Sequence, residues 1–196
     1  MDKVSQQNDI RDQVFQEMER EWPVDDDGFP HRQAARVVVI DSKGDVFLIK
    51  GHDFGDSNRS WWFTVGGGKA NGESDRQAAL RELQEETGLA VSEDRLEGPV
   101  LRRESTFRFV LRDVKQDEMF FLLRVTDAEK STIDRDGNSS LTLIESEVLE
   151  EYRWWNLDEL QAAIKDGETV YPVSFISLAK SWVQGWDGKL SELLDD

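Results

Sequence analysis

The sequence predicts one mixed α/β domain, with helices on the faces of a mixed β-sheet. Strand-like and helix-like runs alternate irregularly along the chain, which favours a mixed sheet. The 196 residues suffice for one ordinary core, and a second full domain is not expected. Hydrophobic residues at 38% and charged residues at 33% indicate a globular protein rather than an extended disordered chain.

Residues 1–34 are expected to form a helical extension and loop outside this domain. Apolar residues recur every four positions before Pro23, a pattern typical of an amphipathic helix with a packing or capping role. The N-terminus lacks the apolar core of a signal peptide, and no apolar run is long enough to span a bilayer. We therefore expect a cytoplasmic protein with no membrane partner. The apolar positions are Ile10, Val14, Met18 and Trp22.

The predicted strands begin after this extension. Residues 35–50 contain two β-branched and aromatic runs around a turn, which predicts a hairpin. A polar, glycine-containing loop is expected at 51–60, and a short strand at 61–65 leads into three glycines. The remaining expectations are strands at 99–111, 118–126 and 151–155, and a loop or tongue at 128–140.

Capping residues predict a helix at 75–87. Ser74 is a favourable N-cap, Gln77 lies three residues later to complete a capping box, and Gly88 suits the left-handed position after the last turn. Similar signals, beginning with Asn156, predict two later helices. These helices are expected at 157–166 and 172–184, the domain at 35–185, and an acidic C-terminal tail at 186–196.

The composition excludes several classes of function. The chain has 41 acidic and 24 basic residues, and its net charge of −17 repels the phosphate backbone of a nucleic-acid duplex. With no cysteine, it has no disulfide, no thiolate nucleophile and no cysteine-ligated metal centre, and two histidines argue against a histidine-rich zinc site. An anionic substrate would therefore need local help from a cation.

The helix predicted at 75–87 concentrates negative charge on one side. At 100° per residue, Glu82, Glu85 and Glu86 fall within an arc of about 100°, and the apolar residues face another way. All-oxygen carboxylate ligands favour hard divalent ions, Mg²⁺ first and Mn²⁺ next, which also bridge to substrate phosphates. The competing interpretation of these three residues alone is a solvated acidic helix face.

The spacing around this helix has a specific resemblance. From Gly67, Glu73 follows after five residues, and Arg81-Glu82 after seven more. An apolar residue, Glu85-Glu86, a glycine and another apolar residue complete the run to Leu89. This pattern resembles the signature box of Nudix hydrolases at every fixed position, and the likeness extends over about residues 35 to 165. The glycine run fits neither a phosphate-binding P-loop nor the dinucleotide pattern.

The resemblance implies a Nudix-like α/β/α sandwich and a metal-dependent active site. By similarity, Glu82, Glu85 and Glu86 would ligate Mg²⁺, and the carbonyl oxygen of Gly66 would be a further ligand. Arg81 would orient these carboxylates through forked hydrogen bonds that a lysine could not reproduce.

The reaction implied by the resemblance is hydrolysis of a phosphoanhydride in a nucleoside diphosphate linked to another moiety. That moiety could make the substrate a nucleotide sugar, ADP-ribose, a dinucleotide or a nucleoside triphosphate, since the family's substrate-specific markers are absent. Glu147 is the favoured general base in an acidic loop, although a purely solvated loop is an even alternative.

The substrate contacts are predicted from strand position. Trp62 and Phe107 could stack on a base, and Arg36 and Arg102 could contact phosphate or sugar. The competing interpretation of the aromatic residues is that they belong to the core.

The sequence leaves two other functions and a homodimeric assembly open. The first is a catalytically silent Nudix-fold module that binds a nucleotide or a protein partner. The second, weaker one is a general acidic cation-binding protein. A homodimer is common in the family, and the N-terminal helix or residues 127–140 could mediate it.

Overall fold

The structure is a computed structural model that describes residues 22–53, 55–110, 112–136 and 148–195. The helix predicted near the N-terminus lies outside the described residues, as does the favoured general base, Glu147. None of the described helices is both long enough and apolar enough to span a membrane.

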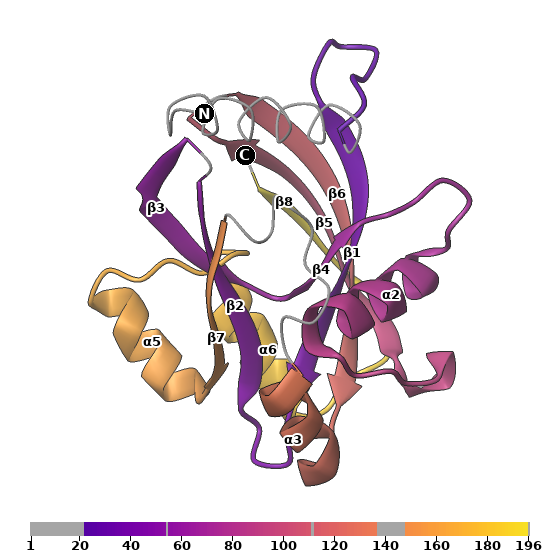
Figure 1. The fold of residues 1–196 in the computed structure, drawn as a ribbon, viewed down its shortest axis with the longest axis vertical. Coiled ribbons are helices and arrows are strands. Elements are labelled where there is room, and N and C mark those ends of the chain that lie inside the picture. The colour runs from indigo at the N-terminus through magenta and orange to yellow at the C-terminus, as the bar shows by residue number, and fades with distance from the viewer. Residues whose placement is uncertain (1–21, 54, 111, 137–147, 196) are drawn as a thin grey trace, which may run out of the picture.

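One mixed sheet organises the described residues (Figure 1). Its main path runs β3-β2-β1-β6-β5-β8, with β4 paired to β1 and β7 paired to β2. Most neighbours are antiparallel, whereas β1 with β6 and β5 with β8 are parallel. The strands are β1 (His31–Ile40), β2 (Val46–Asp53), β3 (Asp56–Phe63), β4 (Val65–Gly68), β5 (Glu97–Arg108), β6 (Asp113–Arg124), β7 (Leu149–Trp155) and β8 (Ser191–Asp195).

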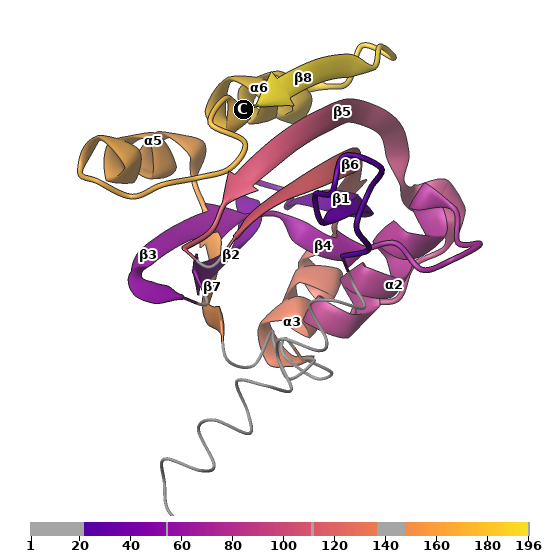
Figure 2. The ribbon, with the colours of Figure 1, turned by 90° about the horizontal axis from the view of Figure 1, so that it is seen from above.

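Helices cover both faces of the sheet, which confirms the predicted α/β/α sandwich. Figure 2 shows α2 and α3 on one side and α5 and α6 on the other. On the first side Leu83 and Ile133 pack against strand residues, and on the second Leu160 and Phe175 do so. The helices are α2 (Asp75–Thr87), α3 (Asp127–Asp136), α5 (Leu157–Lys165) and α6 (Phe175–Gln184), with a short 3₁₀ turn, η1 (Glu93–Arg95).

The prediction of a loop at 51–60 is wrong, because most of these residues form the end of β2 and the start of β3. Backbone pairing between these antiparallel strands holds a segment whose side chains are mainly polar. Asp53 fastens the turn, since its buried carboxylate accepts a hydrogen bond from the Gly55 N–H at 2.8 Å.

The loop predicted from residue 128 is also wrong over its first part, which forms α3. Thr126 and Glu129 make a capping box: the carboxylate of Glu129 accepts from the Thr126 N–H, and the Thr126 hydroxyl accepts from the Glu129 N–H. The single buried apolar residue Ile133 anchors the helix to the core.

The segment predicted as an acidic tail contains β8, which adds a parallel strand to β5. Its last described residue, Asp195, accepts a 2.8 Å hydrogen bond from Arg103 in β5. The C-terminal segment is therefore joined to the sheet that carries the candidate site.

Candidate functional site

Helix α2 begins and ends where its capping residues predict. The Ser74 side chain accepts a hydrogen bond from the Gln77 N–H, the Gln77 side chain accepts from the Ser74 N–H, and Gly88 has φ of 73°. The buried residues Ala78, Ala79 and Leu83 bind the helix to the sheet. This packing leaves the glutamates of the box beside β4 and the cleft described below.

Arg81 joins the box carboxylates to one another. Its Nη1 donates to Glu82 at 2.7 Å and to Glu85 at 2.9 Å. Its Nε and Nη2 form a fork on the two oxygens of Glu73, at 3.0 and 3.1 Å. Nη2 also donates to the carbonyl oxygen of Gly68 at 2.8 Å. One guanidinium therefore connects the helix to the three glycines of β4, residues 66–68, which we call the glycine loop.

The contact between Arg81 and Glu73 shifts both ionisation equilibria toward charge. The hydrogen bonds from Arg81 lower the pKa of Glu73 below its ordinary value, against the opposing effect of partial burial. The pKa of Arg81 is raised by the same hydrogen bonds and by the charge of Glu82. Glu73 therefore stays ionised, and its carboxylate supports the loop before the helix by accepting a hydrogen bond from the Ala70 N–H.

The glycines of β4 admit the carboxylates closely. A Cβ on Gly67 would lie 2.7 Å from the Glu82 carboxyl group, and a Cβ on Gly66 would overlap the carbonyl oxygen of Ala35. Gly66 also has φ of 135°, which other residues rarely adopt. Its N–H donates a hydrogen bond to Glu86 at 2.8 Å, which joins this glycine directly to the helix.

The donor set fits a hard divalent ion by its chemistry. Glu82 and Glu86 are only 5% and 3% exposed, and carboxylates buried to that degree require positive charge nearby. All the candidate ligands supply oxygen, which suits Mg²⁺. Within the described ranges, however, no group of three acidic, histidine or cysteine side chains is arranged as a metal site.

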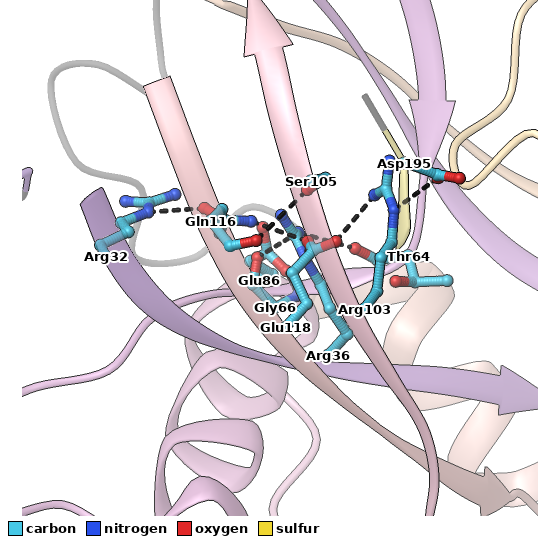
Figure 3. Close-up of polar contacts among 10 residues, drawn as sticks. All are labelled: Arg32, Arg36, Thr64, Gly66, Glu86, Arg103, Ser105, Gln116, Glu118 and Asp195. Atoms are coloured by element: carbon cyan, nitrogen blue, oxygen red, sulfur yellow. Dashed lines mark hydrogen bonds and ion pairs between the residues drawn. The ribbon is translucent and has the colours of Figure 1, made fainter. Parts of the chain in front are cut away.

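A second charged cluster lies behind the glycine loop (Figure 3). Arg36 donates to the carbonyl oxygen of Gly66 at 2.7 Å and to Glu118 at 2.8 Å. Arg103 donates to the other oxygen of Glu118 at 2.7 Å and to Asp195 at 2.8 Å. Burial alone would raise the pKa of Glu118, but the charges of Arg36 and Arg103 hold it below the ordinary value.

A cleft of about 1060 Å³ runs from the box glutamates to a group of half-buried aromatic rings. The rings of Phe107 and Phe109 are 5.9 Å apart and inclined by only 10°. Trp61 lies 5.9 Å from Phe109, and Tyr171 meets both Trp61 and Phe107 edge-on. Partly exposed rings in a concave site can bind a flat ligand group.

The structure brings some predicted substrate contacts to this cleft and not others. Arg36 and Phe107 line it. Trp62 lies in the core at 1% exposure, where it packs edge-on against Trp155, so its prediction as a stacking residue is not supported by its position. Arg102 is exposed and pairs with Glu104 at 2.7 Å, away from the residues that line the cleft.

Sequence reasoning missed the neighbours of these two residues. Trp61 lines the cleft instead of Trp62, and Arg103 lines it instead of Arg102. Because strand side chains alternate between faces, the parity of Phe107 could have selected Arg103 over Arg102. Glu118 and Tyr171 carried no signal of their own in the sequence.

The sandwich, together with the acidic helix beside a large cleft, is the arrangement that the resemblance to Nudix hydrolases predicts. A NUDIX domain model matches residues 30–173, so the chain belongs to the Nudix hydrolase family. This match includes the whole box, from Gly67 to Leu89.

Solved structures agree with the fold. The MutT protein from Methanosarcina mazei Go1 is 20% identical, with coverage of 80% of this chain and 95% of that one and a TM-score of 0.50. The E. coli dihydroneopterin triphosphate pyrophosphohydrolase is 18% identical, with coverage of 78% and 94% and a TM-score of 0.52. A NUDIX hydrolase from Nitrosomonas europaea is 18% identical, with coverage of 76% and 88% and a TM-score of 0.52.

Proposed function

We propose that this protein is a Mg²⁺-dependent pyrophosphohydrolase. It cleaves a phosphoanhydride in a nucleoside diphosphate linked to another moiety, such as a nucleotide sugar, ADP-ribose, a dinucleotide or a nucleoside triphosphate. The observation that carries the proposal is the arrangement of the box glutamates around Arg81 at one end of the cleft.

The charge balance at Arg81 supports the binding of a divalent cation. One guanidinium contacts three carboxylates, Glu73, Glu82 and Glu85, and leaves an excess of negative charge. Glu82, Glu85, Glu86 and the carbonyl oxygen of Gly66 would hold the ion. When bound, Mg²⁺ would supply charge neutralisation for the phosphate oxygens and acidify a bound water.

The chain's own residues would do the positioning. Arg81 holds the carboxylates in place through hydrogen bonds that fix their orientation. Arg36 holds the Gly66 carbonyl from behind, and its contact with Glu118 fixes the direction of its guanidinium. Glu147 stays the proposed general base, which would accept a proton from the attacking water.

The aromatic end of the cleft supports a substrate with a flat group. Phe107, with Trp61, Phe109 and Tyr171, would pack against the base of the nucleoside. Such stacking depends on ring area and tolerates different bases, so it suits a nucleotide-derived substrate without selecting one.

A substrate panel tests the proposal. Phosphate release, after coupled phosphatase treatment, would be measured from nucleotide sugars, ADP-ribose, dinucleoside polyphosphates and nucleoside triphosphates, with and without Mg²⁺. We expect metal-dependent turnover concentrated in one of these groups, which would also name the substrate. Silence across the panel with Mg²⁺ and with Mn²⁺ would contradict the proposal and favour a silent binding module.

A homodimer stays a prediction that solution measurement can decide. Light scattering would give a mass near 22.5 kDa for a monomer and twice that for a dimer. The monomer value would exclude a stable dimer at the concentration used.

A further inference from the structure

The cleft changes character along strands β5 and β6. Paired residues on these strands are charged near the glycine loop, at Arg103 and Glu118, and polar at the next pair on the same face, Ser105 and Gln116. The third pair contains Phe107, and Arg112 lies just beyond it, before β6 begins.

Arg112 differs from the other arginines of the cleft in its partners. Arg36, Arg81 and Arg103 each pair with at least one carboxylate. Arg112 lines the same cleft, but its Nε and Nη2 are shielded from water and have no hydrogen-bond partner among the described residues. Arg112 is half-buried as a whole, but two of its guanidinium nitrogens have lost contact with water and gained no protein partner among the described residues, which costs the free protein stability.

The surroundings hold Arg112 at this end of the cleft. The buried carboxylate of Asp53 accepts from the Val110 N–H at 2.9 Å and pairs with Arg59 at 3.1 Å. Arg59 also donates to the carbonyl oxygen of Arg108 at 3.0 Å. The end of β5, and with it Val110, two positions before Arg112 in the chain, is thereby fastened to the β2–β3 turn.

We propose that Arg112 binds a second anionic group of the substrate, carried by the same nucleoside whose flat group packs on the aromatic rings. This inference rests on the proposed function, which puts the phosphoanhydride at the box glutamates. The ligand class is then a nucleotide with two separated anionic centres: the anhydride at one end of the cleft and a further phosphate at the other. Binding of that phosphate would put a counter-charge beside the two guanidinium nitrogens that have no partner among the described residues.

A pair of nucleotides that differ by one phosphate tests this inference without turnover. Isothermal titration calorimetry in metal-free buffer would compare adenosine 2′,5′-bisphosphate with adenosine 5′-monophosphate. We expect the bisphosphate to bind at least about tenfold more tightly, the effect of a charge-assisted hydrogen bond. In Arg112→Met the two nucleotides should bind equally, whereas Arg108→Ala, an exposed control on the same rim, should keep the preference.

Stability supplies a second, independent readout. Replacing this partly desolvated guanidinium by an apolar side chain should raise the free energy of unfolding of nucleotide-free Arg112→Met above that of the wild type, measured by urea denaturation. A structural arginine would give the opposite sign. The inference is overturned if wild type binds both nucleotides equally or neither of them, if Arg108→Ala loses the preference to the same extent, or if Arg112→Met is less stable.

The two proposals fail separately. Because the binding test contains no metal and measures no hydrolysis, it reports on Arg112 even if the box is catalytically silent. Turnover across the substrate panel with equal nucleotide binding would leave the hydrolase proposal in place and remove only the second anion site.

Discussion

Two arginine clusters hold the two ends of the glycine loop, and they differ in charge balance. Arg36 contacts the carbonyl oxygen of Gly66, and Arg81 contacts that of Gly68. The cluster around Arg36 and Arg103 is balanced by Glu118 and Asp195. The cluster around Arg81 has an excess of carboxylates and is more exposed to solvent.

This difference separates two roles that similar residues can have. A buried, balanced set of ion pairs has no charge left for a ligand, so it can fix geometry but cannot recruit a cation. An acidic, partly exposed set can bind a cation without first breaking its own pairs. The first cluster therefore supports the loop, and the second is the candidate metal platform.

The buried cluster can be broken most severely at Glu118. Glu118→Ala would leave Arg36 and Arg103 in the interior with their shared partner removed, and we expect a loss of about 3–5 kcal/mol in unfolding free energy. Urea denaturation measures it. The matched control is Glu104→Ala, which removes the exposed partner of Arg102 and should cost less than about 1 kcal/mol. Equal losses for both variants would contradict the buried role.

The exposed cluster can be tested at Arg81. Arg81→Lys keeps the charge but loses the fork on Glu73, and we expect metal affinity or kcat/KM to fall by about 10–100-fold with little change in folding. A Mg²⁺ titration of activity checks this, with Arg153→Lys on exposed β7 as control. Wild-type behaviour of Arg81→Lys would show that the fork is unimportant.

The helix that carries the glutamates can be weakened at its start. Ser74→Ala removes the side-chain acceptor for the Gln77 N–H and should lower the unfolding free energy by about 1 kcal/mol. Ser92→Ala is a close control, because Ser92 precedes a 3₁₀ turn without a side-chain capping bond. If both substitutions lower the unfolding free energy by the same amount, the capping box does not stabilise α2.

The smallest expected effect concerns pH. The pKa of Glu73 is lower in the folded protein than its ordinary value of 4.5, which applies to the unfolded chain. Its contact with Arg81 therefore contributes its full stability above that value and loses it as pH falls through the folded pKa. Glu73→Gln should lose less stability than wild type on acidification below about pH 5. Parallel urea curves for Glu73→Gln and for Glu159→Gln, an exposed control, would reveal whether the slopes differ.

Local signals explain how much of this fold could be predicted. The boundaries of α2 depend on Ser74, Gln77 and Gly88, which act within one helix and were confirmed. The capping box of Thr126 and Glu129 is equally local, but the loop predicted from residue 128 was based on the turn-forming residues that follow and did not take this box into account.

Longer-range pairings explain what could not be predicted. Nothing in the local sequence distinguishes the two adjacent tryptophans of β3. Only the pairing of Trp62 with Val170 puts the Trp62 ring in the core and the Trp61 ring in the cleft. The addition of β8 to β5 likewise joins residues about ninety positions apart. The box glutamates were identifiable because their spacing is a motif, whereas Glu118 acquires its partners only through the sheet.

The most direct test of the central claim is turnover by glutamine variants of the acidic helix. On the best substrate of the panel, with saturating Mg²⁺, Glu85→Gln and Glu86→Gln should each lower kcat by orders of magnitude and unfold like the wild type in urea. Glu159→Gln should retain full activity. Wild-type turnover in both box variants would contradict the account.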